Sequence, residues 1–215
     1  MNIPLLDQET EQLLLKHESE PEHTHHVARL ANDLLEGFSV RFQPCGDDRL
    51  LLRCAALLHD TGWSLTQPDG KAHHKASALI ISDFPWQSLN PDQIHQVAAV
   101  ARYHRKALPS DDHLEFFRLR EGLRSRTLWL AACLRLADGL DCRHLQRVEA
   151  VRIEPWGDGW TLRIYAKAEI GPELLAAEKK SDLLLQLTEA PLRICLSEVS
   201  VTVKKPSETD LSQLP

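Results

Sequence analysis

The spacing of apolar residues changes character once along this chain. Up to about residue 147, apolar positions recur at intervals of three and four, the period of one helix face. After Arg147 they alternate with polar positions on both sides of a Gly-Asp-Gly turn, which is typical of a β-hairpin. The sequence therefore predicts an all-α domain at residues 1–147, a small α+β domain at 148–204 and a disordered polar tail at 205–215.

The periodic segments of the first part predict six or seven helices with short connections, which is a helical bundle. Residues 64–72 are polar and rich in turn formers, so we expect an exposed loop there. The predicted fold class is mainly α, with a small α+β part of three strands and one helix. Helices are expected at residues 5–19, 21–37, 48–60, 74–84, 91–104, 110–122, 125–140 and 172–189, and strands at 148–154, 160–166 and 192–203.

The helix that ends at His59-Asp60 is apolar on nearly all of its sides, so it belongs in the middle of the bundle. Gly62 is a plausible stop for this helix. Burying an imidazole and a carboxylate is costly unless something compensates for the lost solvation. The pair is therefore either a hydrogen-bonded core pair or part of a cation site.

Composition narrows the class of protein. A length of 215 residues fits one domain, or one domain with a small appendage. The net charge of -6 argues against a protein that coats nucleic acid. The acidic N-terminus does not resemble a leader peptide, and the apolar runs are too short for a membrane span. The five cysteines form no C-x-x-C pair, which favours reduced thiols in a cytoplasmic protein.

All eleven histidines lie between His17 and His144, so the chemistry is expected in the helical part. Several imidazole and carboxylate groups interrupt apolar helix faces there. Imidazole with carboxylate suits Zn, Mn, Fe, Co or Ni, whereas Mg usually prefers oxygen ligands alone. Ligands on separate rigid helices can converge on one inner point of a bundle. The candidate groups are His23, His59 with Asp60, His74 with His104, and Asp138.

The order His23, His59-Asp60, Asp138 resembles the H…HD…D signature of the HD superfamily of metal-dependent phosphohydrolases. More narrowly, three segments are similar to the C-terminal HD-like region of the exopolyphosphatase / guanosine pentaphosphate phosphatase (Ppx/GppA) family. The chain is too short for the two actin-like domains that carry hydrolysis in exopolyphosphatases, so it resembles a free-standing form of the accessory region. The three segments are residues 73–77, 101–110 and 134–141.

Two better-known HD chemistries are disfavoured by local sequence. Thr61-Gly62-Trp63 lacks the Glu-Asp that follows the HD pair in alarmone hydrolases. No Gly-Tyr-Pro signature occurs and no lysine follows Gly62, which argues against a cyclic-dinucleotide esterase.

The resemblance implies a divalent ion (Mn, Fe, Co, Ni, Zn or Mg) held by His23, His59, Asp60 and Asp138. His74 and His104 are either ligands of a second ion, which would clamp the attacking and leaving oxygens, or one of them is a proton donor. Residues assigned to catalysis are His59, Asp60 and His104.

Cationic residues near these histidines are candidates for binding substrate phosphate. The alternative for those at helix ends is a solvated position that complements the helix dipole. Arg135 either contacts phosphate or supports a ligand, and Asp141 and His144 either support the site or lie on the surface. The substrate-binding candidates are Lys75, Arg102, Arg105, Lys106 and Arg135.

The leading function is hydrolysis of a nucleotide-like or other small phosphate ester by a metal-activated water. The alternative is a non-catalytic regulatory module that senses a phosphorylated ligand, such as polyphosphate or an alarmone, or binds a partner protein. The expected partner is thus a small phosphorylated molecule rather than nucleic acid or membrane. The hairpin, with Trp156 and Trp160, is compatible with a homodimer.

Overall fold

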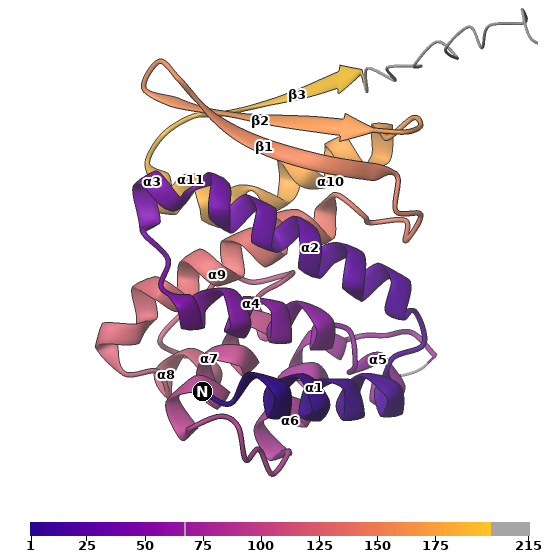
Figure 1. Ribbon diagram of the computed structural model, residues 1–215, viewed down its shortest axis with the longest axis vertical. Helices are drawn as coiled ribbons and strands as arrows, with labels where there is room; N and C mark the ends of the chain where they lie inside the picture. The colour runs from indigo at the N-terminus through magenta and orange to yellow at the C-terminus, as the bar shows by residue number, and fades with distance from the viewer. Residues whose placement is uncertain (67, 199–215) are drawn as a thin grey trace, which may run out of the picture.

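The computed structural model describes residues 1–66 and 68–198 as a helical bundle with a three-stranded sheet at one end (Figure 1). This confirms the predicted fold class. None of the described helices could cross a bilayer. In order, the elements are α1 (Ile3–His17), α2 (Pro21–Gly37), α3 (Ser39–Phe42), α4 (Gly46–Leu58), α5 (Trp63–Thr66), α6 (His73–Asp83), α7 (Pro91–Arg102), α8 (Leu114–Phe117), α9 (Glu121–Gly139), β1 (Val148–Trp156), β2 (Gly159–Ala166), α10 (Gly171–Lys180), α11 (Asp182–Thr188) and β3 (Leu192–Glu198).

Helix α4 lies in the middle of the bundle and contacts α1, α2, α7 and α9. Its apolar side chains are buried on several sides, as a helix surrounded by others requires. The residues at the C-terminal ends of α4 and α9 are buried inside the protein. The buried apolar residues of α4 are Leu51, Leu52, Cys54, Ala55, Ala56, Leu57 and Leu58.

The sheet packs on the bundle and shares its core. Strands β1 and β2 form an antiparallel hairpin, and β3 pairs with β2 in parallel, so the order is β1-β2-β3. A parallel pair needs a crossover connection, and α10 and α11 provide it while packing on α9. At Gly37 a Cβ atom would lie 2.7 Å from Cγ1 of Ile153, so α2 and β1 approach closely. The proposed boundary at residue 147 stays a prediction.

Three predicted elements differ from the structure. The helix expected at 110–122 is only the short α8, because the backbone becomes extended at Arg120, the N-cap of α9. The helix expected at 172–189 is divided at Ser181, whose hydroxyl donates to the carbonyl oxygen of Glu178 (2.7 Å). Residues 63–66 form α5 within the expected loop. The predicted tail and the end of the third strand lie outside the described residues.

Candidate metal centre

The His59-Asp60 turn is hydrogen-bonded to helix α6. The hydroxyl of Ser77 on α6 donates to the carbonyl oxygen of His59 (2.6 Å) and accepts from the N–H of Gly62 (2.9 Å). A Cβ atom at Gly62 would lie 2.1 Å from the carbonyl oxygen of His73. Glycine is thus required here by close backbone packing, in addition to any role in ending α4.

The four predicted ligands converge from three helices. His23 lies in the first turn of α2, His59 and Asp60 follow α4, and Asp138 lies at the end of α9; all four are buried. Oδ1 of Asp138 lies 3.7 Å from Nε2 of His23 and 3.9 Å from Nε2 of His59. Oδ2 of Asp60 lies 4.0 Å and 3.7 Å from the same two nitrogens. The sequence order His, His-Asp, Asp thus becomes one spatial cluster.

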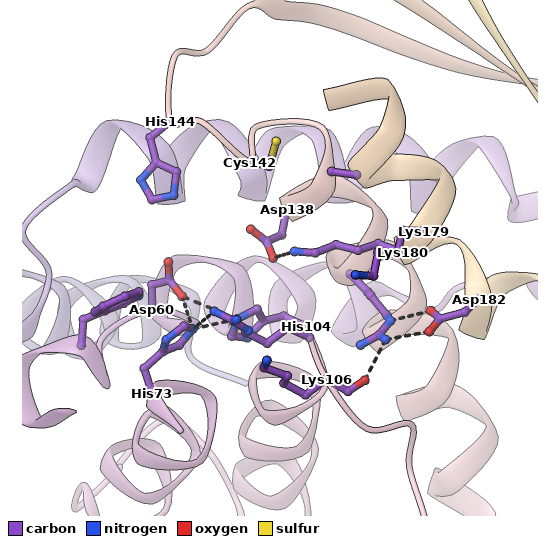
Figure 2. Close-up of a pocket in the computed structure, with 14 residues that line it drawn as sticks. Asp60, His73, His104, Lys106, Asp138, Cys142, His144, Lys179, Lys180 and Asp182 are labelled. Atoms are coloured by element: carbon purple, nitrogen blue, oxygen red, sulfur yellow. Dashed lines mark hydrogen bonds and ion pairs between the residues drawn. The ribbon is translucent and has the colours of Figure 1, made fainter. Parts of the chain in front are cut away.

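A second group meets the other oxygen of Asp60. Oδ1 lies 3.2 Å from Nε2 of His73 and 3.6 Å from Nε2 of His104, and the two nitrogens are 3.2 Å apart (Figure 2). The sequence predicted His74, rather than His73, as the partner of His104. Helix α6 begins at His73 rather than His74, and one residue turns a helical side chain by about 100°. The ring of His74 is 6.3 Å from that of His104, edge on.

Each of the four imidazoles is oriented through Nδ1. This nitrogen of His59, His73 and His104 lies 2.7–2.9 Å from a backbone carbonyl oxygen. That of His23 lies 2.8 Å from Oδ2 of Asp141. Carbonyl and carboxylate oxygens only accept, so Nδ1 carries the proton and Nε2 presents its lone pair to the cluster. Such a partner on the second nitrogen is the usual arrangement of metal-binding histidines.

The unpaired lone pairs fit a cation. Among the described residues, Nε2 of His23 and Nε2 of His59 are buried without a hydrogen-bond partner, and leaving such atoms unsatisfied is costly. Nε2 of His73 faces Nε2 of His104 and also lies 3.4 Å from Nη1 of Arg105, so a cationic group already approaches this pair of imidazoles. Three sets of donor atoms lie within 4.8 Å of one another: His23, His59 and Asp138; His23, Asp60 and His144; and Asp60, His73 and His104.

Charge in the cluster is set by burial and by mutual contacts. Burial and the neighbouring His59 hold the pKa of His104 well below its usual value, so its imidazole is neutral at ordinary pH. Burial alone would raise the pKa of Asp60, but the positive charge that His59, His73 or His104 carries when protonated keeps it well below its usual value. Burial alone would also raise the pKa of Asp138, but the ammonium group of Lys180 lowers it. The resulting pKa of Asp138 lies below its usual value. Neutral imidazoles with ionised carboxylates are the ligand set of a divalent cation.

Four of the cluster residues, Asp60, His73, His104 and Asp138, line a cavity of about 560 Å³ between the bundle and α10 and α11 (Figure 2). Trp63 lies at one side and stacks on His73, with ring centroids 4.6 Å apart. The contribution of the α+β part to the cavity was not predicted from the sequence, because the basic residues of this part form no recognisable motif. The charged lining residues outside the cluster are Arg105, Lys106, Arg135, Lys179, Lys180 and Asp182.

The predicted substrate-binding residues do not all reach this cavity. Arg105 and Lys106 line it. Arg135 also lines it, but its guanidinium donates to Asp182 (2.6 and 2.7 Å) and so fastens α9 to α11. Lys75 is exposed and is not among the lining residues, and Arg102 is buried with Nε 3.8 Å from Glu115.

Asp141 and His144 both contact His23. Asp141 is buried, holds His23 and accepts from the backbone N–H of Gln146 (2.7 Å). His144 stacks on His23 with ring centroids 3.6 Å apart, and its Nδ1 lies 2.7 Å from Oε2 of Glu20. Both residues thus contact a candidate ligand, and His144 also belongs to one of the three donor sets; their roles stay predictions.

A family model described as Ppx/GppA phosphatase, domain III, matches residues 7–180. The matched segment contains every cluster residue, the hairpin and the whole of α10. It therefore extends beyond the helical part into the α+β part.

Proposed function

This chain belongs to the Ppx/GppA phosphatase domain III family, and from that premise we propose that it is a metal-dependent phosphohydrolase of the HD superfamily. Its substrate class is a small, nucleotide-like phosphate ester. The order and convergence of His23, His59, Asp60 and Asp138 support the HD assignment. The cavity that Asp60 and Asp138 line is large enough for a small ligand (about 560 Å³) and carries cationic side chains.

The residues that would hold a divalent ion are His23, His59, Asp60 and Asp138. Asp60, His73 and His104 would hold a second ion. Bound there, such ions supply an activated water and neutralise charge on phosphoryl oxygens. The observation that carries the proposal is the position of Asp60, whose two carboxylate oxygens face two different pairs of imidazole Nε2 atoms.

The protein's own groups provide orientation and charge. Arg105 and Lys106 line the cavity beside His104 and can donate to phosphoryl oxygens. The fixed Nδ1 contacts keep the imidazoles from rotating, so little reorganisation is needed when a phosphate ester binds. The buried carboxylate of Asp60 is ionised and lines the cavity.

A regulatory module is the second candidate. The family model describes the third domain of a phosphatase, and that description alone does not assign the chemistry to this domain. In this alternative the ion stabilises the fold, and the cavity binds a phosphorylated ligand without turnover.

One experiment separates the two candidates. Bound metal is measured by elemental analysis, and turnover is then assayed on nucleotides and phosphodiesters with Mn²⁺, Co²⁺ or Ni²⁺. We expect turnover that Asp60→Asn abolishes and that Asp83→Asn, at an exposed position on α6, leaves intact. Stoichiometric metal without turnover on a broad panel would support the regulatory module. Protein that binds no metal would contradict both.

A further inference from the structure

The carboxylate of Asp138 divides its two oxygens between two kinds of partner. Oδ1 faces the metal centre, 3.7 Å from Nε2 of His23 and 3.9 Å from Nε2 of His59. Oδ2 accepts a hydrogen bond from the ammonium group of Lys180, the last residue of α10 (Figure 2). A lysine of the α+β part therefore contacts a candidate metal ligand of the bundle directly.

Helix α10 is held against α9 and the segment after it by contacts along its length. A Cβ atom at Gly139 would lie 3.1 Å from backbone atoms of α10, so the two helix backbones nearly touch. Arg143 donates two hydrogen bonds of 2.8 Å to the buried Glu173. Arg135 pairs with Asp182 just beyond α10. Tight packing and two ion pairs thus fix the helix that carries the ammonium group.

The ammonium group of Lys180 is also accessible to a ligand. Its side chain is 22% exposed and lines the cavity together with Asp60 and His104. An ammonium group has three N–H donors, and Asp138 accepts only one of them. The remaining donors can reach an oxyanion bound above the metal centre.

We infer that Lys180 positions Asp138 so that Oδ1 alone faces the metal centre, and that it donates a hydrogen bond to a phosphoryl oxygen of the substrate. This inference rests on the proposed function for the identity of the ligand. It makes α10 part of the active site rather than a covering element. The short α+β segment would then be needed for substrate binding.

The test compares the full chain with Lys180→Met, Lys180→Arg and the control Lys167→Met, which changes an exposed lysine of the same part. Inorganic phosphate is titrated calorimetrically with and without Mn²⁺. Removing a charged hydrogen bond to phosphate should weaken binding at least about tenfold in Lys180→Met. Lys180→Arg should retain most of the affinity, and Lys167→Met all of it. The Mn²⁺ EPR spectrum of Lys180→Met should also change, because Asp138 loses its partner.

Phosphate affinity and an EPR spectrum that stay as in the wild type would overturn the inference, as would a wild-type protein that binds no phosphate. If Lys180→Met does not fold, Lys180→Gln removes the charge and carries the same expectation and the same overturning result. A wild-type protein without turnover, but with Lys180-dependent phosphate binding, would refute the proposed function alone. Normal turnover with Lys180-independent phosphate binding would refute this inference alone.

Discussion

The Nε2 atoms of His73 and His104 lie 3.2 Å apart, although each ring donates through Nδ1 to a backbone carbonyl group. Two lone pairs therefore face each other next to Oδ1 of Asp60. Nη1 of Arg105 also lies 3.4 Å from Nε2 of His73, so a cationic group already approaches this pair of imidazoles. This contact with His104 distinguishes His73 from its neighbour His74, which is also buried but is not part of the donor set of Asp60, His73 and His104.

His73→Ala should lose the second of two bound ions and reduce turnover at least about tenfold. Even the loss of a residue that only hydrogen-bonds to a metal ligand lowers metal affinity or activity by about 10–100-fold. His74→Ala is the matched control on the same helix and should keep the metal content of the wild type. Metal per chain is measured by elemental analysis after dialysis against Mn²⁺. Equal metal content in the two variants would contradict the assignment of His73.

Asp141→Asn should weaken metal binding about tenfold, because an amide holds the Nδ1–H of His23 less strongly than a carboxylate. The amide keeps the shape of the side chain, so the fold should persist. Calorimetric titration with Mn²⁺ measures the change in dissociation constant. Asp33→Asn, on the exposed side of α2, should leave it unchanged; an unchanged constant in Asp141→Asn would mean that Asp141 has only a structural role.

The bundle and most of its helix boundaries follow from local pattern, because amphipathic periodicity reports which face is buried. The convergence of His23, His59, Asp60 and Asp138 was predictable from their positions on apolar helix faces together with the resemblance to a known signature. The choice between His73 and His74 was not, since it depends on one residue at a helix start. The contact of Lys180 with Asp138 could not be predicted either, because it arises from packing between segments 42 residues apart.

Gly62→Ala should destabilise the protein by about 1–3 kcal/mol, the usual cost of overpacking, because its Cβ would lie 2.1 Å from the carbonyl oxygen of His73. The turn must shift to relieve this contact, so the orientation of His59 and Asp60 should change too. Urea denaturation measures the free energy of unfolding. Gly122→Ala is the control: nothing lies within 4 Å of its Cβ position near the start of α9, and it should stabilise by about 0.5–1 kcal/mol. Similar effects of the two changes would contradict the close approach at Gly62.

Cys54 and Cys133 should stay unmodified by iodoacetamide at pH 8 in the folded protein, whereas the exposed Cys45 reacts. Burial raises the pKa of the two inner thiols to about 12, and the thiolate is the reactive form. Peptide mapping by mass spectrometry identifies the labelled positions.

The same shift predicts how stability depends on pH. The folded-state pKa of these thiols lies above the ordinary value of 9.0, so the neutral form is favoured by folding. The two buried thiols therefore contribute fully to the free energy of unfolding below about pH 9, and this contribution is lost as the pH rises toward about 12. The free energy of unfolding should fall by up to about 1.4 kcal/mol per pH unit for each thiol in that window. Cys133→Ala should remove one thiol's share of this slope, as measured by denaturation between pH 8 and pH 11; an unchanged slope would contradict the burial of Cys133.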